Sequence, residues 1–251
     1  LDLGEFDLKL DEFDLNNYRF SIDEINLENT KANVVQTKLP EVTTENDTTE
    51  ALALALNHDE IGLKNVSARY TQQATGQVIQ LDLGESKLKA NHIDLIKQVI
   101  DLDKFTLRKT LISYQQQPGK QQPQPGATSD ADSVENSNGW KISLKELELE
   151  DNNIQYYDHA QPYTRGSLDF DHLWITHLGI EARDILVNGA DIKCDLIDFS
   201  FREKSGFVLR SFKAQIDVSD DSAALKNFAM LTNHSNLKFN IYAAYESFEA
   251  L

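Results

Sequence analysis

One spacing of apolar residues recurs along this chain and restricts what it can fold into. In residues 140–158, Ile142 and Leu144 alternate with polar residues, two polar residues follow, and alternation resumes at Leu147 and Leu149. Alternation is typical of a strand with one apolar and one polar face, because successive side chains point to opposite sides of the pleat. The interrupted spacing occurs eight times, in copies that start at Leu8, Phe20, Ile61, Ile100, Ile142, Leu168, Cys194 and Phe207.

The two residues in the middle of each copy predict a bulge within a strand. Pairs such as Asp11-Glu12, Lys64-Asn65 and Asp171-His172 contain no glycine, whereas a two-residue hairpin turn favours residues that tolerate positive φ. A bulge reverses the phase of alternation and bends the strand, so we expect a curled sheet. Four copies begin at positions 20, 61, 100 and 142, the near-constant period expected of a stacked unit.

Turn-forming sequences separate the alternating runs and predict an antiparallel meander. We expect hairpin loops at four of them, residues 28–31 (ENTK), 74–77 (ATGQ), 150–153 (EDNN) and 187–190 (VNGA). Helix signals are weak. Residues 219–231 could form one short helix after an Asp or Ser cap, whereas residues 92–100 are equally compatible with a buried strand.

The chain divides around a segment of low complexity. Residues 115–139 are rich in glutamine and proline and contain almost nothing to bury, which predicts a disordered insert. We expect residues 1–114 and 140–251 to form two parts of one curled sheet. Ile112 before the insert and Ile142 after it would then pair as hairpin partners across an expanded turn.

Composition disfavours several partners and activities. The chain has 24 Lys+Arg against 41 Asp+Glu, a formal charge of −17 that would repel a phosphate backbone, so nucleic acid is not expected as a partner. Cys194 is the only cysteine, which rules out an intramolecular disulfide within this sequence. Its apolar neighbours suggest a small buried side chain.

No arrangement of residues predicts catalysis. His172 and His177 are the only histidines close together in the sequence, and a spacing of five places them on opposite faces of a regular strand. Phosphate-binding, nucleophile and cofactor motifs do not occur. We therefore expect a protein that is not an enzyme, with no catalytic residue, no metal site and no cofactor.

An apolar sheet face must be covered by something. The strands could close into a barrel, fold into a β-sandwich, or curl into an open groove that admits an apolar ligand. From periodicity alone a closed sandwich or barrel is favoured, because alternating strands usually fill a core. The inward residues are mostly Leu, Ile and Phe, so any ligand should be long and apolar, like an acyl chain.

A family resemblance reverses that preference. The segment LKELELEDNNIQYYD (residues 144–158) resembles the recurrent segment of the AsmA/TamB-like envelope proteins, and residues 10–35 and 225–251 are similar to it as well. The C-terminal pattern resembles TamB-type chains (translocation and assembly module) of the Bacteroidetes and is carried by Ser235, Leu237, Tyr245, Ser247, Phe248 and Leu251.

The resemblance implies a fold and a cellular place. It implies an all-β fold, a long antiparallel meander with bulged strands curled into an open β-taco or half-barrel groove, with a closed β-sandwich as the alternative. The chain would be a fragment of a long periplasmic protein, anchored to the inner membrane of a Gram-negative cell envelope by an N-terminal helix outside this sequence.

The resemblance also implies a function in outer-membrane biogenesis. The groove would conduct phospholipids between the inner and outer membranes by holding their acyl chains. The alternatives are a scaffold for outer-membrane protein assembly and secretion, with a β-barrel assembly protein as partner, and a closed β-sandwich adhesin or binding module. The residues expected to line the groove are Ile142, Leu144, Leu147, Leu149, Leu168, Phe170, Leu173, Ile175, Leu196, Phe199 and Phe201.

Overall fold

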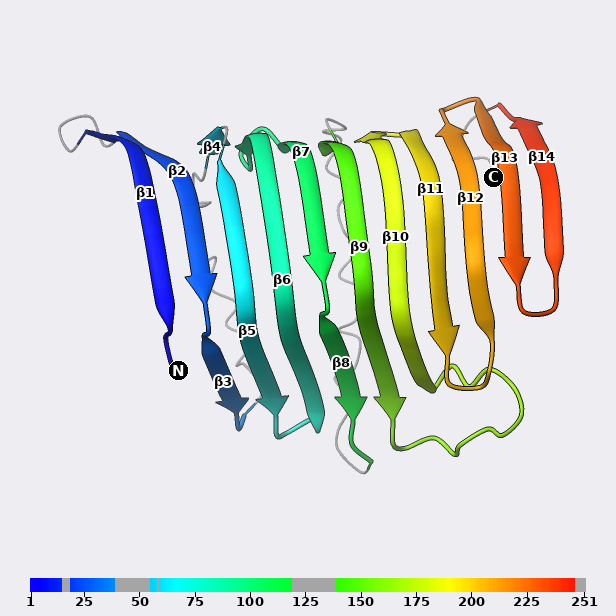
Figure 1. The fold of residues 1–251 in the computed structure, drawn as a ribbon, viewed down its shortest axis with the longest axis horizontal. Coiled ribbons are helices and arrows are strands. Elements are labelled where there is room, and N and C mark those ends of the chain that lie inside the picture. Colours follow the sequence, from blue (N-terminus) through cyan, green and yellow to red (C-terminus); the bar gives the residue numbers. More distant parts are fainter. Residues whose placement is uncertain (15–18, 39–54, 58, 119–138, 247–251) are drawn as a thin grey trace.

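The computed structural model describes residues 1–14, 19–38, 55–57, 59–118 and 139–246. These residues form a single sheet of 14 strands and contain no helix (Figure 1). The strands are β1 (Glu5–Asp14), β2 (Arg19–Glu28), β3 (Lys31–Gln36), β4 (Ala55–Asn57), β5 (Glu60–Gln72), β6 (Gln77–Asp94), β7 (Val99–Arg108), β8 (Leu111–Gln116), β9 (Lys141–Asp158), β10 (His172–Asn188), β11 (Asp191–Glu203), β12 (Val208–Val218), β13 (Ser222–Thr232) and β14 (Asn236–Ala244).

The sheet is a meander with two parallel pairings. From β9 to β14 every strand pairs antiparallel with the next, but β2 and β3 run parallel to β5, and β7 and β8 run parallel to β9. The expected hairpin between Ile112 and Ile142 is therefore wrong. Ile112 pairs with Ile154 in a parallel register, because β8 ends at the same rim of the sheet as β9 and the chain must cross back to begin β9.

Two of the four turn predictions are confirmed. Residues 74–77 connect β5 to β6 and residues 187–190 connect β10 to β11, with Gly76 and Gly189 at φ 77° and 60°. Residues 28–31 and 150–153 do not reverse the chain. Asn29 lies between β2 and β3, which continue in the same direction, and Asp151 lies inside β9. A single left-handed residue, which Asn and Asp tolerate, kinks these strands instead.

The kinks lie side by side and form one line across the sheet. Positive φ values occur at Asn29, Asn65, Lys109, Asp151 and His177, and the strands that carry them are neighbours in the sheet except that β6 lies between β5 and β7. Asn65 donates a hydrogen bond from its amide to the Asn29 side chain (3.1 Å), and the His177 ring contacts the Asp151 carboxylate (2.7 Å). Gly84 of β6 lies between Asn65 and Lys109. We call these six residues the crease.

Bulges away from the crease add further curvature to the strands. The register of β1 and β2 shifts so that Asp11 and Asp23 have no partner, and Asp103 is skipped between β6 and β7. The predicted bulges are confirmed at these positions. At Lys64-Asn65 the register is unbroken, so the change of phase there comes from the left-handed Asn65 and not from an extra residue.

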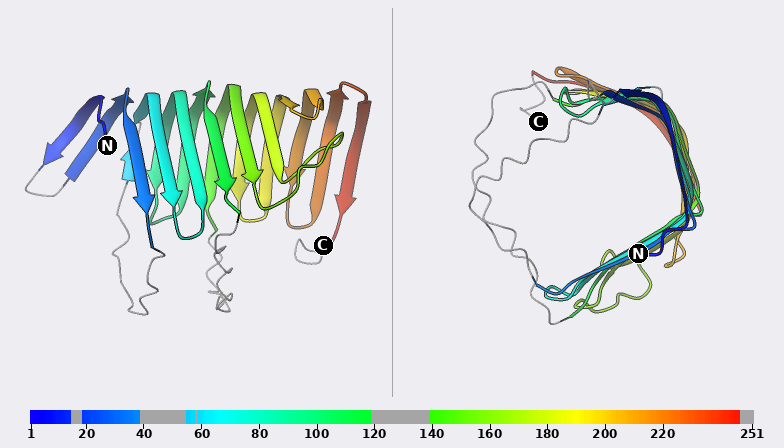
Figure 2. Two further views of the ribbon diagram at one scale, coloured as in Figure 1. Left: turned by 90° about the horizontal axis from the view of Figure 1, so that it is seen from below. Right: turned by 90° about the vertical axis from the view of Figure 1, so that its left-hand side faces the viewer.

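The sheet curls into an open half ring. Figure 2 shows the strands end-on as an arc that does not close, and no second sheet faces it among the described residues. The open groove predicted for this chain is confirmed, and the closed β-sandwich alternative is wrong. We call the concave side of the arc the inner face and the convex side the outer face.

Backbone hydrogen bonds show which side chains lie on each face. In a strand of L-residues, the neighbour towards which a residue's N–H and C=O point fixes the side on which its side chain lies. The Lys64 carbonyl accepts a hydrogen bond from Asn29, which belongs to the neighbouring strand. With the strand directions of Figure 1, this places Lys64 on the outer face and its neighbour Leu63 on the inner face.

The expected helix at residues 219–231 is wrong, because this segment forms β13. Ala223 and Leu225 alternate on one face, Asn227 has a φ of 54°, and Phe228 and Met230 resume on that face. The three-residue step across the kink has the same spacing as one turn of a helix. The apolar pattern of a kinked strand therefore imitates a short amphipathic helix.

The crease predicts a specific effect of adding one methyl group. A Cβ at Gly84 would lie 2.7 Å from the Lys109 carbonyl oxygen and 2.8 Å from that of Arg108. Both are backbone atoms that cannot move without shifting the β7–β8 kink, so we expect Gly84→Ala to destabilise the fold by about 1–3 kcal/mol. Urea unfolding measures the change. Gly139→Ala is the control, since its nearest neighbour would lie at 3.7 Å, and an equal effect of both would contradict the account.

Candidate functional site

The inner face is the candidate functional site. Residues paired across neighbouring strands share a face, so the register carries an inner-face assignment from one strand to the next. At the rim where β9 begins, eight strands in succession contribute one aliphatic residue each. This row, the aliphatic rim, consists of Ile93, Ile100, Ile142, Val187, Ile192, Val218, Ala223 and Ala243.

Nine of the eleven predicted lining residues lie on strands at the inner face. Ile142, Leu144, Leu147 and Leu149 follow one another along β9 and pair with Val187, Ile185, Ala182 and Ile180 of β10. Leu173 and Ile175 begin β10 and pair with Tyr156 and Ile154. Leu196, Phe199 and Phe201 lie on β11, opposite Ala214, Phe212 and Leu209.

Two predicted lining residues lie outside the sheet. Leu168 and Phe170 belong to the loop before β10, and Phe170 is 73% exposed. The prediction that they continue a strand is wrong. Their spacing matches the repeat, but the carboxylate of Asp169 between them accepts hydrogen bonds from the backbone N–H groups of Thr164 and Asp171, which folds this segment into a loop.

The predicted residue Phe199 belongs to a row of aromatic side chains that continues to the last strand of the sheet. The rings of Phe199, Phe212, Phe228 and Phe239 lie on β11 to β14, with centroids 6.4, 5.1 and 3.9 Å apart in succession. Phe228 and Phe239 stack nearly parallel. Phe228 was not predicted to line the inner face because residues 219–231 were expected to form a helix. The interrupted spacing of Ala223, Leu225, Phe228 and Met230 is the signal that indicates a strand here.

Apolar side chains on the inner face remain accessible to solvent. Phe6 is 52% exposed, Ile79 43% and Ile241 52%. Among the described residues, only six apolar side chains are fully buried: Leu83, Ala90, Leu178, Ala182, Leu209 and Ala214. The sheet therefore has no sealed core formed by these residues, and its inner face presents a broad apolar surface.

Polar groups on the inner face near the crease are already occupied. Asn152 accepts a hydrogen bond from the Thr110 N–H (3.0 Å) and donates one to the Leu107 carbonyl (2.9 Å). Both Asn152 and Thr110 are buried. The Asn152 side chain hydrogen-bonds backbone groups at the kink, where ladder hydrogen bonds are interrupted. Its polar atoms are therefore not available to bind a specific polar ligand.

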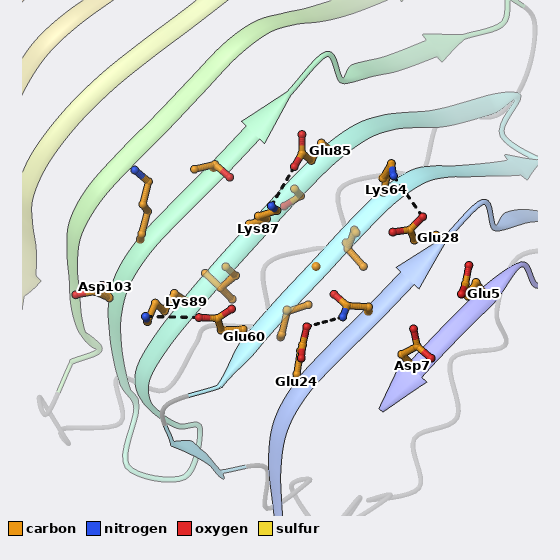
Figure 3. Close-up of a pocket in the computed structure, with 18 residues that line it drawn as sticks. Glu5, Asp7, Glu24, Glu28, Glu60, Lys64, Glu85, Lys87, Lys89 and Asp103 are labelled. Atoms are coloured by element: carbon orange, nitrogen blue, oxygen red, sulfur yellow. Dashed lines mark hydrogen bonds and ion pairs between the residues drawn. The ribbon is translucent and has the colours of Figure 1, made fainter. Parts of the chain in front are cut away.

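The outer face carries a charged hollow of about 820 Å³ across β1, β2 and β5 to β7 (Figure 3). Figure 3 shows Lys64 paired with Glu28, Lys87 with Glu85, and Lys89 with Glu60, at 3.4–3.5 Å. These side chains are about 37–71% exposed. Exposed pairs of this kind contribute little to stability. The hollow has the character of a solvated sheet face.

The loop between β9 and β10 forms a small cluster of side chains with the start of β10 on the outer face. His172 is fully buried, contacts the Asp169 carboxylate through Nδ1 (2.9 Å) and stacks on Tyr163 (3.8 Å between centroids). Burial alone would raise the pKa of Asp169, but hydrogen bonds from the Thr164 N–H and from His172 lower it below its ordinary value. His177, the second predicted neighbour, belongs to the crease, so the two histidines do not form one site.

Comparison with protein-family models, curated proteins and solved structures finds no match to this chain. In the described part of the chain, no helix is long and apolar enough to cross a membrane. The same residues contain no group of three side chains that could hold a metal ion.

The Asp169 contacts predict how the loop before β10 responds to mutation and to pH. The pKa of Asp169 is lowered in the folded chain, so its stabilising contribution is present above the unfolded pKa of about 3.9 and is lost as pH falls through the lower folded value. Asp169→Asn should speed amide hydrogen exchange at Thr164 at neutral pH and remove this acid dependence. Asp171→Asn is the control, and equal exchange in both variants would contradict the assignment.

Proposed function

We propose that this chain is a segment of an AsmA/TamB-like envelope protein whose inner face conducts phospholipids between the inner and outer membranes. The observation that carries the proposal is the half-exposed apolar surface, which extends from Phe6 in β1 to Ile241 in β14. The resemblance of residues 144–158 to this family supports a location in the periplasm of a Gram-negative envelope, with an anchor in the inner membrane.

The physical role of the groove is to keep acyl chains out of water. Exposing a hydrocarbon chain costs about 0.8 kcal/mol per methylene, so a chain of about 16 carbons would lose roughly 12 kcal/mol in free water. Rows of Leu, Ile and Phe that repeat from strand to strand offer nearly the same contacts at each step. A lipid could therefore move along the sheet without meeting a deep trap, and the chain needs no catalytic group or cofactor for this.

A specific observation supports the alternative of a scaffold for outer-membrane protein assembly. The sheet is not closed, so β1 and β14 each leave one edge without a neighbouring strand in the described part, and every residue of β14 is exposed. Such an edge can accept a further strand by backbone pairing. A β-barrel assembly protein would be the partner. The adhesin alternative required a closed sandwich and is not proposed.

The test compares two Asp substitutions in purified protein. Leu147→Asp places a charge among half-buried inner-face residues, and Phe170→Asp makes the same change in the exposed loop. We expect native mass spectrometry to find phospholipid bound to the unaltered chain and to Phe170→Asp, with at least a tenfold loss in Leu147→Asp, since a buried charge costs more than about 1.4 kcal/mol.

Far-ultraviolet circular dichroism verifies that both variants keep the sheet. A lipid-free unaltered chain, or equal lipid in the two variants, would overturn the lipid proposal. Crosslinks from β14 edge positions to a barrel protein, with no lipid bound at the inner face, would favour the scaffold.

A further inference from the structure

The inner face differs between its two rims. At the rim where β3, β5, β8 and β9 end, successive strands place Gln36, Gln72, Gln77, Gln116 and Asp158 in one row, which we call the glutamine rim. Gln72, Gln116 and Asp158 are buried. The aliphatic rim, at the opposite ends of the strands, has no polar residue.

A row of tyrosines lies just inside the glutamine rim. Tyr70, Tyr114 and Tyr156 share a register row with Val34 and Ile79. The rings of Tyr114 and Tyr156 stack with centroids 5.5 Å apart. Tyr70 donates a hydrogen bond to the Gln36 side chain, and Tyr114 donates one of 3.4 Å to Gln116. The hydroxyl groups of these two tyrosines therefore point towards the glutamine rim, and their rings lie on the side of the aliphatic residues.

This order of side chains matches an amphiphile. A tyrosine ring is apolar and its hydroxyl is polar, and proteins place such residues where hydrocarbon meets polar groups. From the aliphatic rim to the glutamine rim, the inner face passes from Ile142 through Leu147 and Leu149 to Tyr156 and then Asp158. Across the inner face, aliphatic side chains are thus followed by aromatic rings and then by amide and carboxylate groups.

Charge at the glutamine rim favours one class of head group. The row contains amides and one carboxylate, that of Asp158, which is the last residue of β9. No lysine or arginine belongs to the row. Burial, and next the charge of Asp158, raise the pKa of Tyr156, which is consistent with a negative environment. The chain as a whole has a formal charge of −17.

We propose that the groove holds a phospholipid in one orientation, with its acyl chains towards the aliphatic rim and its head group at the glutamine rim. The head group is one that carries an ammonium or neutral hydrogen-bonding groups, not one with a net negative charge. This inference rests on the proposed lipid-conducting function and adds the orientation and the head-group class.

The orientation is tested with two photoreactive phosphatidylethanolamine probes bound to the full chain. One probe carries a diazirine at the end of an acyl chain, and the other carries it next to the glycerol. Peptide mapping should find the chain-end label near Ile100, Ile142 and Ile192, and the glycerol label near Tyr114 and Tyr156. Labelling of both regions by both probes, or the reverse pattern, would overturn the orientation. No inner-face labelling by either probe would instead overturn the proposed function.

The head-group class is tested by competition. Phosphatidylethanolamine should displace the probe about five to ten times better than phosphatidylglycerol with identical chains, and added salt should reduce the difference because it screens charge. Asp158→Asn should reduce the ratio, and Asp191→Asn, at the opposite rim, is the control. An equal or inverted preference in the unaltered chain would overturn the head-group assignment and leave the orientation standing.

Discussion

The curvature of this sheet depends on residues with positive φ that lie within a strand or between two strands that continue in the same direction. Asn29, Asn65, Lys109, Asp151 and His177 lie on one line across the sheet, with Gly84 of β6 between Asn65 and Lys109, so their kinks add instead of cancelling. Each kink also reverses the phase of alternation, which keeps apolar side chains on the concave side both before and after the bend. A shape that surrounds a groove and a surface suited to an apolar ligand therefore come from the same residues.

Stability and function place opposite demands on the inner face. The described strands are held by backbone ladders and by cross-strand contacts, such as the Phe228–Phe239 stack at 3.9 Å. They lack the sealed second layer that usually covers an apolar sheet face. The side chains that would form the core of a sandwich therefore stay accessible, as the proposed lipid binding requires. The polar residues at the crease satisfy the backbone and do not interrupt the surface.

Local spacing predicted the strands, and it predicted the inner-face position of nine of the eleven named residues, because alternation reports directly on the faces of a strand. It misassigned residues 28–31 and 150–153 because an Asn- or Asp-centred left-handed residue has the same local sequence in a kink and in a hairpin. The helix expected around Phe228 arose because a three-residue step occurs in both structures. The parallel pairing of Ile112 with Ile154 could not be predicted, since it depends on where the crossing chain re-enters the sheet.

The central claim is that the inner face is open to apolar molecules in the folded chain, and Cys194 measures it directly. Cys194, the only cysteine of the sequence, lies on the inner face of β11 opposite Ile216, and partial burial raises its pKa. An apolar maleimide should modify it in the folded protein, and phospholipid vesicles should slow that reaction. In a Cys194→Ser background, Lys193→Cys on the outer face should react at a rate that lipid does not change. A Cys194 that stays inert until the chain unfolds would contradict the open groove.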